Sequence, residues 1–190
     1  MPSAFDVLSK DHEEVKQMLS ELEQGPTAAS GASANELALR KKMAEQLVIE
    51  ESRHEAAEEM YFWPAVREHV AGGDRLADEA TAQEQEGKQV LDKLDKLEAG
   101  DGQFEQVLGQ FIKAGRDHIA FEENEVWPAL RQAMTAEQAQ QLGDDLELAK
   151  KAAPTRPHPH TPPSSGVQKA AGPAAAVADA ARDAASGRGE

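Results

Sequence analysis

The chain has 190 residues, a formal net charge of −15 and no cysteine. Without cysteine, disulfides and thiolate metal sites are excluded, so any metal site must use histidine and carboxylate ligands. The negative charge argues against nucleic acid as a partner, because phosphate groups would be repelled. Neither a secretory signal nor an apolar run long enough to span a membrane is visible, and we therefore expect a cytoplasmic protein without membrane association.

Residues 3–151 have the composition of helices. Ala, Glu, Leu, Gln and Lys predominate there, and no run alternates with the period of a strand. Breaks rich in glycine, followed by capping residues such as Ser3 and Ser33, divide this region. We predict helices over 3–24, 34–70, 74–98, 101–133 and 136–151. Because the connections are short, neighbouring helices should be antiparallel, which predicts an all-α, up-down four-helix bundle with a short fifth helix.

Residues 152–190 differ in composition, and we assign them to a C-terminal tail, leaving residues 1–151 as the bundle domain. The segment PTRPHPHTPPSSG is too rich in proline for a helix, so we interpret it, including His158 and His160, as an extended linker. The alanine-rich stretch 173–186 predicts a weak helix. Its expected docking face consists of Ala176, Val177, Ala180, Ala181 and Ala184. This face is small, so we expect the tail to be disordered or loosely docked.

One segment of the bundle region occurs twice. LVIEESRHEAAEEMYFWPAVR spans residues 47–67, and FIKAGRDHIAFEENEVWPALR spans residues 111–131. Both match the pattern H-x3-E-E-x3-W-P-A-x-x-R, and both tryptophans of the chain fall at the same place in it. Chance is a poor explanation for this agreement, so the repeated residues are candidates for a shared chemical role.

The spacing of the repeat places its histidines and carboxylates inside the bundle. His54 and Glu58 lie one turn apart on one helix face, as do His118 and Glu122. His12 falls on the apolar stripe of the first helix. Burying these groups costs several kcal/mol unless they are paired or bound to a metal. A buried His–Glu network without metal is the alternative, but two identical pairs together with His12 favour a metal centre.

These motifs resemble those of the hemerythrin-like family, whose members carry the HHE cation-binding domain. The resemblance rests on His12 in DHEEV, on the doubled H-x3-E and on the W-P that follows, and it covers about residues 4–132. It implies a cofactor of two non-haem iron ions joined by an oxo or hydroxo bridge. The implied ligands are His12 and His54 on one iron, His118 on the other, and Glu58 and Glu122 between them.

The sequence departs from this family in the third predicted helix, 74–98, which contains no histidine where members usually supply one or two. The periodicity of its apolar residues predicts that Glu86 and Glu79 face inward. Glu86 is then the first candidate for an additional ligand and Glu79 the next, and Glu55 on the second helix is a further option. The alternative for each is a solvated helix carboxylate.

Other residues of the repeat have simpler interpretations. Glu59 and Glu123, one position beyond the metal-binding carboxylates, should turn away and be solvated. Tyr61 lies on a face similar to that of His54, so it is a candidate for a hydrogen bond beside the site, with ordinary packing as the alternative. The two tryptophans should cap one end of the core.

A carboxylate in place of a third-helix imidazole favours the ferric state and argues against reversible oxygen carriage. We therefore predict a reaction with a small species, O2, hydrogen peroxide or nitric oxide, in oxidative or nitrosative stress. Its enzymatic form would be a peroxide- or NO-consuming di-iron oxidoreductase. One alternative is a non-enzymatic module that stores or senses iron or oxygen, and another is a metal-free helical interaction protein.

Overall fold

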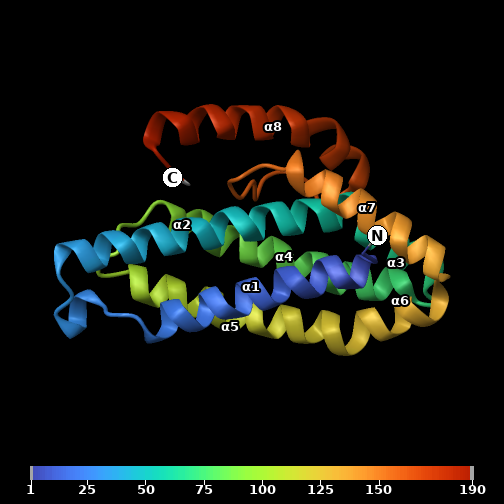
Figure 1. Ribbon diagram of the computed structural model, residues 1–190, viewed down its shortest axis with the longest axis horizontal. Helices are drawn as coiled ribbons and strands as arrows, with labels where there is room; N and C mark the ends of the chain where they lie inside the picture. The colour runs from blue at the N-terminus through green and yellow to red at the C-terminus, as the bar shows by residue number, and fades with distance from the viewer. Residues whose placement is uncertain (1, 189–190) are drawn as a thin grey trace.

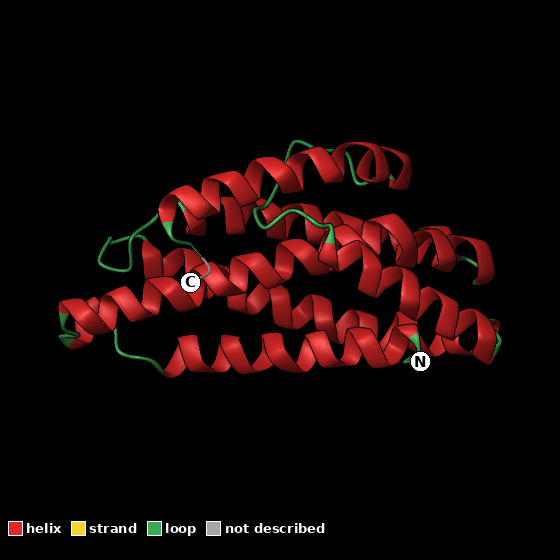
Figure 2. Ribbon diagram, turned by 45° about the horizontal axis from the view of Figure 1, so that its top comes forward, coloured by secondary structure: helices red, strands yellow, loops and turns green. Residues whose placement is uncertain are grey.

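The computed structural model describes residues 2–188, and within that range it contains helices and no strand (Figure 1). Four long helices form the bundle: α1 (Ala4–Gln24), α2 (Ala34–Ala57), α4 (Gly73–Asp95) and α5 (Phe104–Phe121). The colours of Figure 1 show that consecutive helices of the bundle run in opposite directions, and Figure 2 shows the loops that join the helices in green. The predicted all-α, up-down four-helix bundle is confirmed. None of the helices between residues 2 and 188 is long and apolar enough to cross a membrane.

Capping explains where the helices begin. Three of them start with a capping box, in which a hydroxyl and a side chain three residues later bond each other's backbone N–H groups: Ser3 with Asp6, Ser33 with Glu36, and Thr135 with Gln138. α4 instead follows Gly72, whose φ of 79° lies in the left-handed region that favours glycine. A short 3-10 turn, η1 (Ala28–Ser30), lies in the connection between α1 and α2.

The predicted helices 34–70 and 101–133 are each interrupted by one turn of π-helix. The turn η2 (Glu58–Phe62) separates α2 from α3 (Trp63–His69), and η3 (Glu122–Val126) separates α5 from α6 (Trp127–Ala133). The prolines of the repeat explain the interruption, because they have no N–H to continue the α-helical ladder. The N–H of the preceding tryptophan bonds instead to the carbonyl five residues back, that of Glu58 or Glu122.

The predicted fifth helix is α7 (Ala136–Lys151), and it packs against α1 and α2 at one end of the bundle. Gly143 makes this close packing possible. A Cβ atom at this position would lie 2.5 Å from the carbonyl oxygen of Pro2 and 2.9 Å from the backbone nitrogen of Ala4. α7 therefore rests directly on the first turn of α1.

The C-terminal segment, residues 152–188, folds back over the bundle and ends in α8 (Ser165–Ser186), which lies above α2 in Figure 1. The predicted apolar docking face is wrong, since Val177 is 72% exposed. The buried positions of α8 are Gln168, Gly172, Asp179 and Asp183. Alanine methyl groups offer little apolar area, whereas buried aspartates can bind cationic partners.

Those partners come from the preceding proline-rich stretch. Asp179 accepts hydrogen bonds from His158 Nε2 (2.9 Å) and the Arg156 backbone N–H (3.2 Å), and Asp183 accepts one from the Arg156 guanidinium (2.7 Å). The interpretation of His158 as a plain linker residue is therefore corrected. These contacts fasten α8 to the stretch before it, and the ion pairs of Arg156 and Arg188 with Asp95 join the segment to α4.

The apolar core is divided into two clusters. Leu8 and Trp127 belong to one cluster, and Val15 and Phe111 belong to the other. His12 lies on α1 between Leu8 and Val15, so a polar layer separates the clusters. The fold therefore places the candidate metal-binding residues between two well-packed apolar regions.

Candidate metal centre

Three histidines from three helices converge in the polar layer. His12 on α1 and His54 on α2 are 1% and 5% exposed, and His118 on α5 joins them. Glu58 and Glu122, the first residues of the two π turns, are fully buried. The Nε2 atoms approach these carboxylates closely: His12 to Glu122 at 3.0 Å, His54 to Glu58 at 3.2 Å, and His118 to Glu122 at 3.3 Å.

Two groups of these side chains have the geometry to hold a cation. In each group the ligand atoms all lie within 4.8 Å of one another, and the members are buried. The first group is His12, His54 and Glu122, and the second is Glu58, Glu84, His118 and Glu122. Because Glu122 belongs to both groups, the two positions adjoin each other. A carboxylate has two oxygens and can therefore serve both.

The outer nitrogen of each imidazole is held by a separate acceptor. The three Nδ1 pairs are His12 with Glu123 Oε1 (3.0 Å), His54 with Asp11 Oδ2 (3.2 Å) and His118 with Gln83 Oε1 (3.0 Å). These oxygens only accept, so Nδ1 must carry the hydrogen and donate it. When such a ring is neutral, its Nε2 lone pair points toward the carboxylates. This is the arrangement that orients a metal-binding histidine.

The inner atoms of the layer have no hydrogen-bond partner, although more than nine in ten buried polar atoms in native proteins have one. The unpartnered atoms include His12 Nε2, His118 Nε2, both carboxylate oxygens of Glu58 and of Glu122, and Glu84 Oε2. The short contacts among these groups therefore lack hydrogen-bonding geometry. A cation would satisfy all of them at once, so the residues present fit a metal centre.

Glu84 lies on α4, which corresponds to the third predicted helix, and it occupies the inward position expected of an additional ligand. It is 1% exposed, and its Oε1 accepts a hydrogen bond from the indole Nε1 of Trp63 at 2.5 Å. Glu86 and Glu79, which were predicted to face inward, are exposed. The predicted phase of this helix is wrong because its buried face runs through Ala80, Glu84 and Leu91. The small residues on that face gave little hydrophobic signal.

Sequence comparison agrees with this geometry. The model of the family described as "Hemerythrin HHE cation binding domain" matches residues 3–130. The chain belongs to this family. Its domain is thus a hemerythrin-type cation-binding domain, and the resemblance seen in the repeated motif is confirmed.

Three individual proteins are similar to the chain. A hemerythrin-like protein of Schizosaccharomyces pombe is 26% identical over 96% of this chain and 86% of its own length. A DNA nickase of a Nostoc species is 25% identical over 76% of this chain, but the match spans only 38% of that protein. A crystal structure of a Hemerythrin HHE cation binding domain-containing protein from Mycobacterium kansasii has a TM-score of 0.65 with 20% identity, covering 80% of this chain and 86% of the other.

Burial and mutual repulsion make the polar layer of this hemerythrin domain electrostatically unusual. Burial raises the pKa of Glu55 to about 8 and that of Glu84 well above its ordinary value. Burial alone would lower the pKa of His118, but the charges of Glu122 and Glu58 outweigh it and raise that pKa to about 9. Without a cation, the layer therefore retains protons that a bound metal would displace.

The second carboxylate of each repeat is not solvated in the way the sequence suggested. Glu59 is 1% exposed, and its Oε1 accepts a hydrogen bond from the ammonium of Lys88 at 2.5 Å. The side chain of Glu123 is 30% exposed and binds both His12 and Lys16. In both repeats a lysine of a neighbouring helix, Lys88 of α4 or Lys16 of α1, binds this second carboxylate.

The remaining candidates lie around the layer. Glu55 is 3% exposed, although it belongs to neither cation-binding group. Tyr61 is partly buried and packs beneath Lys169 of α8, whose Nζ lies 4.0 Å from the ring centroid. Trp127 stacks on the imidazole of His12 with a centroid distance of 4.7 Å. The tryptophans therefore contact the polar layer directly, which the repeat pattern alone did not reveal.

Proposed function

We propose that the hemerythrin domain binds two iron ions in adjacent positions of the polar layer. The proposed ligands are His12 and His54 for one ion, His118 and Glu84 for the other, and Glu58 and Glu122 shared between them. The observation that carries this proposal is the set of buried, unpartnered imidazole nitrogens and carboxylate oxygens that converge there. Imidazole and carboxylate together suit iron, and neither thiolate nor thioether ligands are present in the two groups.

We further propose that the loaded centre reacts with a small species, O2, hydrogen peroxide or nitric oxide, in protection against oxidative or nitrosative stress. Bound iron would supply redox chemistry at coordination positions that the protein side chains leave open. The chain's own residues orient the imidazoles through their Nδ1 partners, and the two apolar clusters exclude water on both sides. The carboxylate-rich ligand set favours the ferric state.

The first test is elemental analysis of the purified full chain together with its absorption spectrum. We expect roughly two irons per chain, and the double substitution His54→Ala and His118→Ala should reduce the content to near zero, because each metal position loses one imidazole ligand. His69→Ala is the matched control, since His69 ends α3 away from the layer. Unchanged metal content in the double variant would contradict the assignment.

A second test concerns the ligand on α4. Glu84→Gln keeps the size of the side chain and an oxygen that can accept from Trp63, but it removes the carboxylate charge. We expect the iron content to fall from roughly two to roughly one per chain, because the second position then retains one imidazole and only the shared carboxylates. Glu86→Gln, an exposed change of the same type on the same helix, should leave the content unchanged.

The reaction is tested on the iron-loaded chain by following hydrogen peroxide and nitric oxide in separate experiments. Consumption of either species over many turnovers supports the redox proposal. A chain that holds iron but consumes neither species would reject that proposal in favour of iron storage or sensing.

A further inference from the structure

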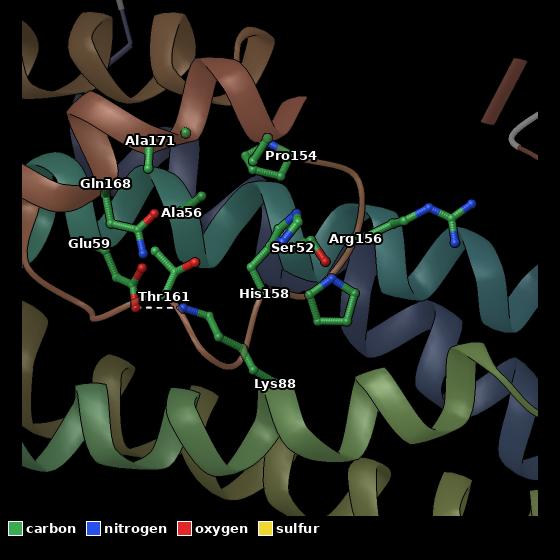
Figure 3. Close-up of a pocket in the computed structure, with 13 residues that line it drawn as sticks. Ser52, Ala56, Glu59, Lys88, Pro154, Arg156, His158, Thr161, Gln168 and Ala171 are labelled. Atoms are coloured by element: carbon green, nitrogen blue, oxygen red, sulfur yellow. Dashed lines mark hydrogen bonds and ion pairs between the residues drawn. The ribbon is translucent and has the colours of Figure 1, made fainter. Parts of the chain in front are cut away.

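A small cavity lies between the C-terminal segment and the bundle (Figure 3). Its volume is about 30 Å³, which is room for roughly one or two water-sized molecules. α2, η2 and α4 form the inner wall, with Ser52, Glu59 and Lys88 among the lining residues. The C-terminal segment forms the outer wall, where His158 and Thr161 contribute polar groups. The cavity therefore exists only because that segment is docked.

The inner wall carries polar atoms without a partner. Ser52 is 5% exposed and Glu59 is 1% exposed, and neither Ser52 Oγ nor Glu59 Oε2 makes a hydrogen bond. Such atoms are rare in native proteins and call for a bound molecule that both donates and accepts hydrogen bonds.

The charges around the cavity are already balanced. Figure 3 shows the ion pair between Glu59 and Lys88, whose Oε1–Nζ distance is 2.5 Å. The guanidinium of Arg156 is paired with Asp95 and Asp183. A cation or an anion would upset this balance, whereas a neutral molecule would not. The small volume further restricts the molecule to one or two non-hydrogen atoms.

The inner wall of the cavity also borders the polar layer. Glu59 directly follows Glu58, and Lys88 lies one helical turn beyond Glu84 on α4. Glu58 and Glu84 are the carboxylates of the second cation-binding group. The Glu59–Lys88 pair therefore belongs to the cavity wall and also lies beside that group along both chain segments.

We propose that this cavity binds one small neutral molecule that both donates and accepts hydrogen bonds, of the class of water and hydrogen peroxide, and that it is the lateral entrance to the metal layer. The entrance part rests on the proposed function. The binding part does not, because it depends only on the unpartnered wall atoms and the available volume.

The binding part is tested by a high-resolution crystal structure of the full chain. We expect an ordered molecule within about 3.2 Å of Ser52 Oγ or of Glu59 Oε2, and hydrogen peroxide should replace water there after soaking. An empty cavity would overturn the proposal. This result does not depend on iron content, so it distinguishes failure of the cavity site from failure of the metal assignment.

The entrance part is tested with Ser52→Val, which removes the hydroxyl and narrows the cavity. In the iron-loaded chain we expect the second-order rate constant for peroxide consumption to fall roughly tenfold, because one hydrogen bond and the space for the molecule are lost. Iron content and the ferric absorption spectrum should stay unchanged. Ser20→Val is the matched control, since Ser20 is a half-buried serine on α1 that does not line the cavity.

Ser52→Ala separates the two effects of the valine variant, because it removes the hydroxyl but leaves the space. We expect an intermediate loss of rate, which supports hydrogen bonding within the cavity as part of entry. A Ser52→Val chain with normal iron content and a wild-type rate would overturn the entrance. An equal loss of rate in Ser20→Val would overturn it as well, since the effect would then not be specific to the cavity.

Discussion

The three buried imidazoles differ in the acceptors that hold their outer nitrogens. Asp11, which binds His54, is itself buried and is also paired with Lys150. Glu123, which binds His12, is partly exposed, and the acceptor of His118 is a neutral amide. Carboxylate partners raise the basicity of an imidazole more than an amide does. The two proposed metal positions should therefore differ in affinity even though the repeat makes their sequences alike.

Asp11 provides a test of this orienting role. Asp11→Asn keeps the shape of the side chain but weakens the acceptor for His54 Nδ1, so we expect the affinity for iron to fall about 10–100-fold. Competition with a chelator measures the change. Asp117 precedes His118 just as Asp11 precedes His12, but its side chain is 67% exposed and pairs with Lys113. Equal losses of affinity in Asp11→Asn and Asp117→Asn would contradict the prediction.

At the scale of the elements, the π turns determine which carboxylates reach the interior. Each turn begins at a proposed metal ligand and is followed by the Trp-Pro of the repeat. In η2 both Glu58 and Glu59 are buried, whereas in η3 only Glu122 is, together with Val126. The difference follows from the neighbours, because α4 presents Lys88 to η2, while Lys16 of α1 meets η3 near the surface.

This asymmetry between the repeats predicts different costs for the same substitution. Glu59→Gln leaves the buried ammonium of Lys88 without its ion-pair partner, so we expect a loss of about 3 kcal/mol in the free energy of unfolding. Glu123→Gln affects a partly exposed pair, and the loss should stay below about 1 kcal/mol. Thermal or denaturant unfolding of both variants in the same metal state measures the difference. Similar losses would show that Lys88 finds sufficient compensation elsewhere.

At the scale of the whole molecule, the polar layer makes stability depend on metal and pH together. The pKa of Glu55 is raised from 4.5 to about 8, and that of His118 from 6.5 to about 9. For each group, when the pH lies between the ordinary pKa and the raised pKa, the unfolded chain has released a proton that the folded chain still holds. Both groups therefore lower the stability of the folded state as the pH increases, so long as no cation replaces those protons.

We expect the midpoint temperature of thermal unfolding of the metal-depleted chain to decrease when the pH is raised from 6.5 to 8. The two shifts act in the same direction, so the loss should reach at least about 1 kcal/mol, which corresponds to about 2–4 °C for a chain of this size. The iron-loaded chain should lose less, because its ligands are already deprotonated. Calorimetry of both forms in matched buffers measures this, and parallel curves would contradict the prediction.

The sequence by itself determined the helical class, the caps and the doubled His-x3-Glu pattern. These features depend on local propensity and on the helical period, which act within a few residues. Ser3 and Ser33 therefore mark helix starts correctly, and the family follows from residues 3–130. The pattern also predicted which histidines and glutamates would share a helix face.

Only the tertiary structure decided what surrounds those residues. Glu84 rather than Glu86 faces the layer because α4 is rotated by its contacts with α2 and α5, and its small residues carry little periodic signal. Asp11 and Lys88 became partners of the layer through contacts between helices far apart in the sequence. The C-terminal segment docks through Asp95 of α4, whose partners Arg156 and Arg188 lie more than sixty residues away. Local patterns do not contain such pairings, because packing between elements sets them.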